Sequence, residues 1–343
     1  MITSNSAESG DLEPDDVRIL RALQLDPRAP YAQIGAVLGL SETAVRRRYL
    51  RLHADGIIRV VGVLDPGALG QSRWLVRLRC RPGSVAAISA GLARRDDVSW
   101  IAVGAAGTEI TCAVRSRTTT DRDDLIGHRL PRTAAVLDIS AAAILRQFIG
   151  GRGHYWAALA GTLTPAEETA FGSAPFVESA VVAAAPAILD ATDEKLIAAL
   201  AVDGRAALSA LAAAANLTPG RAARRLQALL EHRVVHIDVE IAPAALGLHT
   251  RAALLLRIHP AHLSAAGRAL ARDPAVPFAA ATSGRDNLHA VAHCRDLDAL
   301  YELTTTRLGE LPGLQSMEIS PIDHQVKQAA TRLTADRLAR PTP

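Results

Sequence analysis

The sequence is poor in cysteine and lysine. Its 343 residues include three cysteines, Cys80, Cys112 and Cys294, each in an apolar run. Three scattered cysteines are too few for a disulfide framework or a zinc site, so we expect reduced core residues. Only Lys195 and Lys327 are lysines among 38 basic residues. Any contacts to phosphate groups would therefore be made by arginine.

Long apolar runs and a large excess of charge are also absent. No apolar stretch has the ~20 residues that a membrane span needs, and residues 1–16 contain no apolar signal core. We therefore expect a soluble, cytoplasmic protein without membrane contacts. The net charge is only +3, from 38 basic and 35 acidic residues. This excludes a polybasic coat, so any surface for nucleic acid must be local.

The chain contains an internal repeat at a constant offset of 177 residues. The segment DVRILRALQLDPR, from Asp16, aligns with DEKLIAALAVDGR, from Asp193. At the same offset, PGALG from Pro66 aligns with PAALG from Pro243. A constant offset over separated segments indicates a duplication. The sequence therefore predicts two homologous units, and each feature of one unit can be checked in the other.

The first part of each unit has the pattern of a helix-turn-helix. In the first unit, apolar residues at helical spacing follow Pro14, and a second helix is predicted from about Tyr31 to Leu38. Gly39-Leu40-Ser41 then offers a helix-ending glycine and a serine N-cap for a third helix, which ends near Asp55-Gly56. Residues 57–64 are predicted to form a hairpin or strand, which would be a wing.

The second part of each unit is predicted to be β-α-β-β-α-β. In the first unit we expect strands at Ser72–Cys80, Val98–Val103, Glu109–Arg115 and Val136–Leu145, and helices at Ser84–Arg94 and Thr119–Leu130. In the second unit we expect strands at Arg251–Ile258, Val276–Ala281, Leu288–Cys294 and Leu314–Ile322, and helices at Ala261–Arg272 and Leu297–Gly309. This order is typical of a ferredoxin-like fold, whose sheet leaves one face for a partner.

The predicted fold class is α+β, with two tandem units of a winged helix-turn-helix followed by a ferredoxin-like domain. The expected boundaries are 1–11 for a flexible tail, 12–64 and 191–241 for the helix-turn-helix domains, 65–147 and 242–325 for the ferredoxin-like domains, 148–190 for a linker with a short helix, and 326–343 for a C-terminal tail. The two ferredoxin-like sheets can pair within one chain or between chains, and the sequence leaves both arrangements open.

Several motifs carry a specific resemblance. They are Gly39-Leu40-Ser41, Gly56-Ile57-Ile58 and DPGALG from Asp65 in the first unit, and TSGRD from Thr282 in the second. In this order they resemble the leucine-responsive regulatory protein/AsnC (Lrp/AsnC) family of bacterial transcription regulators, in a tandem form. The resemblance implies double-stranded DNA and a small effector, an amino acid or related metabolite, as partners. It also implies homo-oligomers, dimers or larger, and a binding protein without a cofactor rather than an enzyme.

The third helix of the first unit is the leading candidate for DNA binding. A serine-capped N-terminus favours a phosphate, and side chains away from the Val45 face can enter a major groove, where arginine reads guanine. The candidate contacts are Ser41, Glu42, Thr43, Arg46, Arg47 and Arg51. From Ser41 to Arg59 there are five arginines and two acidic residues, a local charge of +3. A solvated arginine-rich helix is the alternative explanation.

The equivalent helix of the second unit is the weaker candidate. Its predicted contacts are Thr218, Arg221, Arg224 and Arg225. The stretch from Asp193 to Asp238 holds six basic and five acidic residues, a local charge of only +1. We therefore expect the first unit to supply more of the affinity for DNA. A metabolite-sensing scaffold in which both helices are degenerate is a further alternative.

The resemblance implies an effector site at the turn between the second and third strands of each ferredoxin-like domain, at a dimer interface. The candidate residues are Thr282, Ser283, Gly284, Arg285 and Asp286 in the second unit, and Gly107 and Glu109 in the first. Asp286 can hold an ammonium group, and Arg285 a carboxylate. An ordinary polar hairpin turn explains these residues equally well.

Siroheme decarboxylases share this architecture and provide the enzyme alternative. Their second strand typically carries an H-N-Y-x-R-type motif, whereas Ser99–Val103 and Pro277–Ala281 contain neither histidine nor arginine. We therefore expect no catalytic residues, and the histidine spacing predicts no metal site. His289 and His293 alternate on a strand, and we expect them to face solvent rather than to line a pocket.

Overall fold

The computed structural model describes residues 12–116, 118, 120, 123–150, 156–172, 187–329 and 331–340. The first unit contains α1 (Pro14–Leu25), α2 (Tyr31–Leu38), α3 (Glu42–Ala54), β1 (Ile58–Leu64), β2 (Ser72–Cys80), α4 (Val85–Ala93), β3 (Val98–Gly104), β4 (Glu109–Ser116), a π-helical turn (Asp123–Arg129) and β5 (Val136–Ile149). The second contains α7 (Ala191–Val202), α8 (Leu208–Ala214), α9 (Pro219–Glu231), β6 (Val235–Ile241), β7 (Thr250–Ile258), α10 (Leu263–Ala271), β8 (Phe278–Thr282), β9 (Leu288–Cys294), α11 (Leu297–Glu302), a π-helical turn (Leu303–Leu308) and β10 (Leu314–Gln328). The helix expected at Thr119–Leu130 lies partly outside the described residues.

The helix-turn-helix elements begin and end at residues whose chemistry explains them. Gly39 ends α2 in the left-handed conformation, with φ of 72°. Ser41 is the N-cap of α3, because its side chain accepts a hydrogen bond from the backbone N–H of Ala44. The buried residues of α3 include Val45 and Leu52, so the predicted core face is confirmed. None of the helices in the described ranges is long and apolar enough to cross a membrane.

The predicted wing is a single strand that pairs with the other unit. β1 and β6 form an antiparallel two-stranded ribbon, in which Ile58 pairs with Ile241. Val61 pairs with Asp238, which is its own counterpart at the 177-residue offset. A pseudo-two-fold axis therefore passes through this pair. The ribbon joins the two helix-turn-helix domains within one chain.

The two ferredoxin-like sheets also pair within the chain. β3 of the first unit pairs with β10 of the second, and β5 pairs with β8. The strand order is β10-β3-β4-β2-β5-β8-β9-β7, and β7 pairs again with β10. These eight strands thus form a closed antiparallel sheet without an exposed edge among them. The question that the sequence left open is answered in favour of intramolecular pairing.

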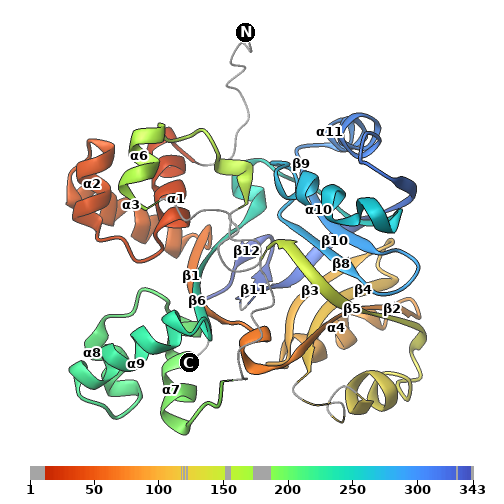
Figure 1. Cartoon of the computed structure of the whole chain (residues 1–343), viewed down its shortest axis with the longest axis horizontal. Coiled ribbons are helices and arrows are strands. Elements are labelled where there is room, and N and C mark those ends of the chain that lie inside the picture. Colours follow the sequence, from red (N-terminus) through yellow and green to blue (C-terminus); the bar gives the residue numbers. More distant parts are fainter. Residues whose placement is uncertain are drawn as a thin grey trace.

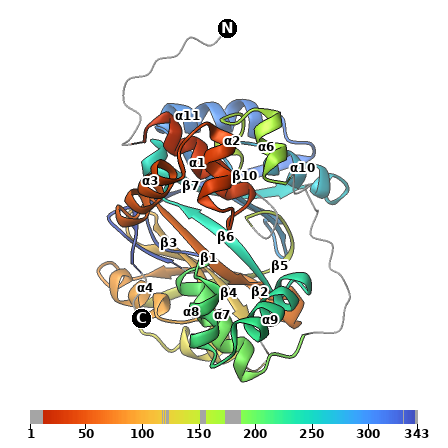
Figure 2. The same ribbon diagram turned by 90° about the vertical axis from the view of Figure 1, so that its left-hand side faces the viewer.

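Helices cover the outer faces of this closed sheet. Figure 1 shows α10 and α11 on one side and α4 on the other, with the strands of both units between them. Each outer face has its own apolar core, such as the cluster around Val76, Leu78 and Ile110 in the first unit. Figure 2 shows the β1–β6 ribbon between the two groups of helix-turn-helix helices. The inner faces of the strands are therefore free to enclose a space.

The segments expected as linker and tail are partly ordered. β5 and β10 run on to Ile149 and Gln328, beyond their predicted ends. After β10, the chain forms β11 (Thr331–Thr334) and β12 (Arg337–Leu338). The prediction that residues from 326 onward form a tail is therefore wrong for these two strands.

The linker helix α6 (Pro165–Ala170) packs beside α1 and α2, and Phe171 is buried in the core of the first helix-turn-helix. Residues 1–11, the other expected tail, lie outside the described residues.

Candidate functional site

The outer face of α3 carries exposed polar side chains, as expected. Glu42, Thr43, Arg46 and Arg47 are all exposed, whereas Val45 is fully buried on the opposite face. Arg46 and Arg47 form no hydrogen bond or ion pair with another described residue. Two guanidinium groups are thus available on the face of α3 that a recognition helix would place in a major groove.

Other arginines of this stretch serve the protein itself. Arg48 forms an ion pair with Asp16 at 3.1 Å, and Arg51 also contacts this carboxylate, which is fully buried. Arg48 further bonds to Glu13 at 2.8 Å. Arg59 is buried and donates to backbone carbonyls. The local charge of +3 therefore overstates the charge that α3 offers to a ligand.

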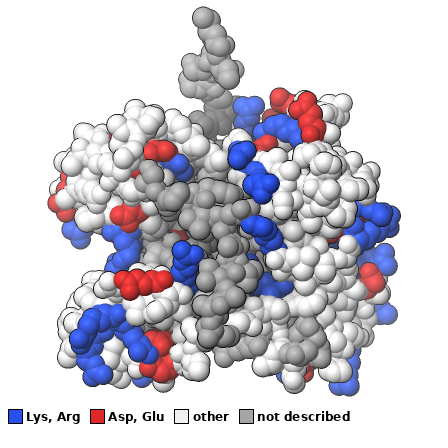
Figure 3. Space-filling view, viewed as in Figure 1, with Lys and Arg blue, Asp and Glu red and all other residues white. Residues whose placement is uncertain are grey.

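The second unit has the same arrangement around α9. Arg221 and Arg224 are exposed, and Arg225 is ion-paired with Asp190 and Asp193. At the 177-residue offset, Arg225 corresponds to Arg48. Thr218 occupies the N-cap position of α9 but makes no side-chain capping bond. Figure 3 shows Lys and Arg side chains at the left-hand edge of both helix-turn-helix domains.

The two helix-turn-helix domains are joined by reciprocal arginine contacts. Arg28 donates to the backbone carbonyls of Gly204 and Ala206. Arg205, its counterpart, donates to the carbonyls of Pro27 and Ala29 at 2.6 and 2.8 Å. Such exchange of equivalent contacts is the pattern of a two-fold interface. It fixes the position of α3 relative to α9.

The residues predicted for the effector are largely engaged by the protein. The Thr282 hydroxyl donates to the carbonyl of Asp286 at 3.0 Å, and Ser283 Oγ accepts from the backbone N–H of Ala143 at 2.9 Å. Arg285 is exposed, and Gly284 has φ of 101°. The turn therefore lies against β5 of the other unit.

The equivalent turn of the first unit lies against β10. The backbone N–H of Gly107 donates to the Asp323 carboxylate at 2.7 Å. Glu109 forms an ion pair with Arg77 at 3.0 Å. Both predicted turns are thus at the junction of the two units, with their polar groups satisfied in large part by the protein.

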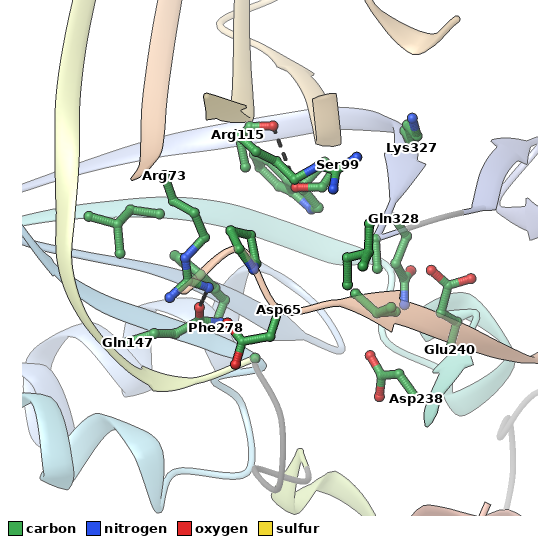
Figure 4. A pocket seen from close by; sticks show the side chains of 18 of the residues that line it. Asp65, Arg73, Ser99, Arg115, Gln147, Asp238, Glu240, Phe278, Lys327 and Gln328 are labelled. Atoms are coloured by element: carbon green, nitrogen blue, oxygen red, sulfur yellow. Dashed lines mark hydrogen bonds between the residues drawn. The ribbon is translucent and has the colours of Figure 1, made fainter. Parts of the chain in front are cut away.

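A large cavity lies elsewhere, between the inner faces of the closed sheet and the β1–β6 ribbon. Its volume is about 1140 Å³, and none of the predicted effector residues lines it. Figure 4 shows Arg73, Arg115 and Lys327 on strands of the sheet, with Asp238 and Glu240 on the ribbon side. The cavity therefore has basic and acidic walls. It is larger than most small-molecule pockets, which span about 300–1,000 Å³.

Two basic residues of the cavity, Arg73 and Lys327, have neutral partners, whereas Arg77 in the same lining is ion-paired with Glu109 and Glu318. Arg73 donates to the amide oxygen of Gln147, and Lys327 donates to the carbonyl of Arg95 at 2.9 Å. Burial lowers the pKa of both Arg73 and Lys327. Lys327 is only 8% exposed. Burying a cation without a carboxylate partner is unfavourable, so these groups favour an anion in the cavity.

The expectation that His289 and His293 face solvent is wrong. Both line the cavity, and His293 is only 7% exposed. Burial and the nearby Arg251 lower the pKa of His293 to about 3, so this imidazole is neutral at pH 7. Within the described ranges, no group of three or more His, Cys, Asp or Glu residues could hold a metal ion.

The sequence alone did not predict the residues that line the cavity. Arg73 and Arg77 alternate with Trp74 and Val76 along β2, and this period of two places them on the face opposite to the apolar core. The arginines on one face of this strand were the signal in the sequence that could have indicated a polar site. The signal was not sufficient, because that face becomes a cavity wall only when the sheet of the second unit packs opposite to it.

Comparison with known proteins identifies matches in both units. The model of the AsnC-type helix-turn-helix domain matches residues 14–53 and 189–230. The model of the Lrp/AsnC ligand binding domain matches residues 251–331. The doubled helix-turn-helix match agrees with the duplication.

Two archaeal regulators are among the similar curated proteins. The HTH-type transcriptional regulator LrpA of Pyrococcus horikoshii is 28% identical over 138 residues, which cover 40% of this chain and 98% of the regulator. The HTH-type transcriptional regulator FL11 of Pyrococcus abyssi is 25% identical over 121 residues, which cover 34% of this chain and 80% of the regulator. Each relative has the length of one unit.

A solved structure resembles the whole two-unit fold. The crystal structure of the siroheme decarboxylase NirDL has a TM-score of 0.61 with this chain and covers 92% of it, as well as 93% of its own length. Its sequence identity is 14%, so the likeness concerns the fold.

Proposed function

Because this chain belongs to the Lrp/AsnC family as a tandem of two units, we propose that it regulates transcription by binding double-stranded DNA as a single-chain equivalent of a dimer. The observation that carries this proposal is the pseudo-two-fold arrangement of α3 and α9. Each presents an exposed arginine pair, Arg46 with Arg47 and Arg221 with Arg224. The ribbon and the reciprocal Arg28 and Arg205 contacts fix their spacing. Two recognition helices related by a two-fold axis suit two half-sites of one operator.

Selection of bound DNA from a genomic fragment library tests this function. The selected fragment is then titrated at several salt concentrations by fluorescence anisotropy. We expect the logarithm of the binding constant to fall linearly with the logarithm of salt concentration, since counterions are released from phosphates. Failure to enrich any fragment, together with no binding at 50 mM salt, would contradict the proposal and favour a scaffold.

A small effector is part of the proposed function. An amino acid at the turn of residues 282–286 would rely on the exposed Arg285 and on Asp286, because both hydroxyls are already hydrogen-bonded. Calorimetry with a panel of amino acids, on the intact chain and on Asp286→Ala, tests this site. Binding that is unchanged in Asp286→Ala would exclude it.

We propose a binding protein rather than an enzyme. The regulators LrpA and FL11 support this choice, as does the lack of histidine and arginine in the segments 99–103 and 277–281. Incubation of the purified chain with siroheme, followed by mass spectrometry, tests the alternative. We expect no loss of carboxyl groups, and decarboxylated product would establish an enzyme.

A further inference from the structure

The central cavity contains two arginines in a direct cross-strand pair. Arg73 on β2 is opposite Arg115 on β4 in the strand register, and both line the cavity. Residues in this relation have adjacent side chains on the same face of a sheet, so like charges repel there. Arg115 has partners in the protein, because its guanidinium donates to the backbone carbonyl of Asp96 at 2.7 Å. An external anion would therefore act mainly on Arg73.

Arg73 forms no ion pair with a described carboxylate. Its hydrogen-bond partner is the neutral Gln147. The carboxylate of Asp65 lies near enough to raise its pKa, but this group accepts a hydrogen bond from the backbone N–H of Gly67 at 2.9 Å. Arg73 is therefore a partly buried cation without an ion-pair partner among the described residues, and an external anion can pair with it.

The acidic residues of the lining lie mainly on other elements. Asp238 and Glu240 belong to the ribbon, and Figure 4 shows them away from Arg73 and Gln147. Asp238 accepts from the N–H of Val239 at 2.9 Å, and Glu240 is bonded to Thr331. Asp65, Asp96 and Glu194 complete the acidic part of the lining, and the backbone carbonyl of Asp96 accepts a hydrogen bond from Arg115. Arg73 and Arg115 thus lie together on β2 and β4, away from the acidic residues of the ribbon.

Aromatic side chains also line the cavity. The sequence has only three tryptophans and four phenylalanines, yet Trp100, Trp156 and Phe278 all line the cavity. Phe278 lies close to Gly150, where a Cβ atom would come within 2.9 Å of the ring. Flat apolar faces next to guanidinium groups suit a planar ring system that carries an acidic group.

Polar atoms without partners also line the cavity. They are His293 Nδ1, Gln71 Oε1 and Gln328 Oε1, which are buried and make no hydrogen bond to a described residue. Buried polar groups are normally satisfied, so these atoms indicate a polar occupant. A volume of about 1140 Å³ admits a molecule much larger than a free amino acid.

We propose that the central cavity is a binding site for a planar aromatic organic anion, whose acidic group is held by Arg73 and whose ring lies against Phe278. This site is separate from the turns of residues 105–110 and 282–287. It also does not depend on the proposed regulation of transcription, because none of its residues lies on α3 or α9.

The test uses two fluorescent probes of similar shape and different charge. The anionic probe is 8-anilinonaphthalene-1-sulfonate, and its neutral counterpart is N-phenyl-1-naphthylamine. Both are titrated into the full chain, into Arg73→Gln and into Arg79→Gln. Arg79 is the matched control, because it is an exposed arginine of the same strand outside the cavity lining. Binding of the neutral probe also reports whether Arg73→Gln keeps the cavity.

We expect Arg73→Gln to bind the anionic probe about tenfold more weakly, while its affinity for the neutral probe changes less than about twofold, since a charge-assisted hydrogen bond is lost. Arg79→Gln should bind both probes like the unaltered chain. Equal affinity of Arg73→Gln and the unaltered chain for the anionic probe would overturn the proposal. An equal loss in Arg79→Gln, or an equal loss for both probes in Arg73→Gln, would also overturn it.

Discussion

In the first helix-turn-helix domain α1 is held from outside by α6, whereas none of the described helices packs in this way against α7 in the second domain. Arg18 pairs with Glu167 and Arg21 with Glu168, both at 2.7 Å. Among the described residues, this support is found in the first unit.

The C-terminal segment adds a second difference. The backbone N–H of Leu338 donates to the carbonyl of Gly56 at 2.8 Å, next to the end of α3. Arg59 donates to the carbonyls of Leu338 and Ala339. Its counterpart in the second unit is His236. The contacts that join the units are kept in both copies, while the contacts of the first helix-turn-helix domain with α6 and with the C-terminal segment involve, among the described residues, the first copy.

The largest expected effect comes from Arg59. Arg59→Ala removes hydrogen bonds to several buried carbonyls, so we expect a loss of about 2–4 kcal/mol in the free energy of unfolding. His236→Ala should cost less than half as much. Urea denaturation followed by circular dichroism measures both free energies of unfolding. Equal losses would show that the contacts of Arg59 with Leu338 and Ala339 add no stability to the first unit.

The second effect concerns pH and distinguishes the units through His293, whose counterpart is Ser116. The pKa of His293 in the folded protein, about 3, lies below that of an unfolded histidine, because of burial and the positive charge of Arg251. As pH falls below about 6.5, the unfolded chain binds the proton first, so stability decreases; between pH 7 and pH 5 the loss is about 2 kcal/mol.

His293→Ser makes the second unit like the first at this position and should remove that dependence. The control is the difference between pH 7 and pH 5 within each protein, so any uniform loss from the substitution cancels. A decrease of the same size in His293→Ser and in the unaltered chain would mean that other groups cause it.

The third effect should be larger in the second unit. Arg225→Ala removes the arginine that pairs with the buried Asp193 and should cost about 1–2 kcal/mol of unfolding free energy. After Arg48→Ala the buried Asp16 keeps its contact with Arg51, so we expect a smaller loss. Thermal and urea unfolding measure the two variants side by side. An equal or larger loss in Arg48→Ala would show that Arg51 does not compensate for Arg48.

Local elements were predictable from the sequence, because caps and periodicity are local. Gly39 and Ser41 mark the turn between α2 and α3, and the alternation along β2 marks a strand. The pairing of β1 with β6 was not predictable, since a strand pattern does not name its partner. The same limit concealed the closed sheet and its cavity.

Charge counting along the sequence had a related limit. The local +3 included Arg48 and Arg59, and the structure uses both internally, one for Asp16 and one for backbone carbonyls. Which arginines remain for DNA depends on carboxylates that are distant in sequence. Arg46 and Arg47 are the pair that remains exposed on α3.

The smallest expected effect tests the central claim, that one chain binds DNA with both units and more strongly with the first. Arg47→Ala and Arg224→Ala occupy equivalent exposed positions, so each is the control for the other. Neither residue has a partner among the described residues, so both variants should keep the stability of the unaltered chain.

The decisive measurement is the salt dependence of DNA binding for these two variants, by fluorescence anisotropy on the selected fragment. We expect Arg47→Ala to weaken binding by about 5–10-fold and to reduce the salt slope by about one, and Arg224→Ala to weaken it about threefold. An equal or larger loss for Arg224→Ala would contradict the asymmetry between the two units. No loss in either variant would contradict the assignment of α3 and α9 as the DNA-binding helices.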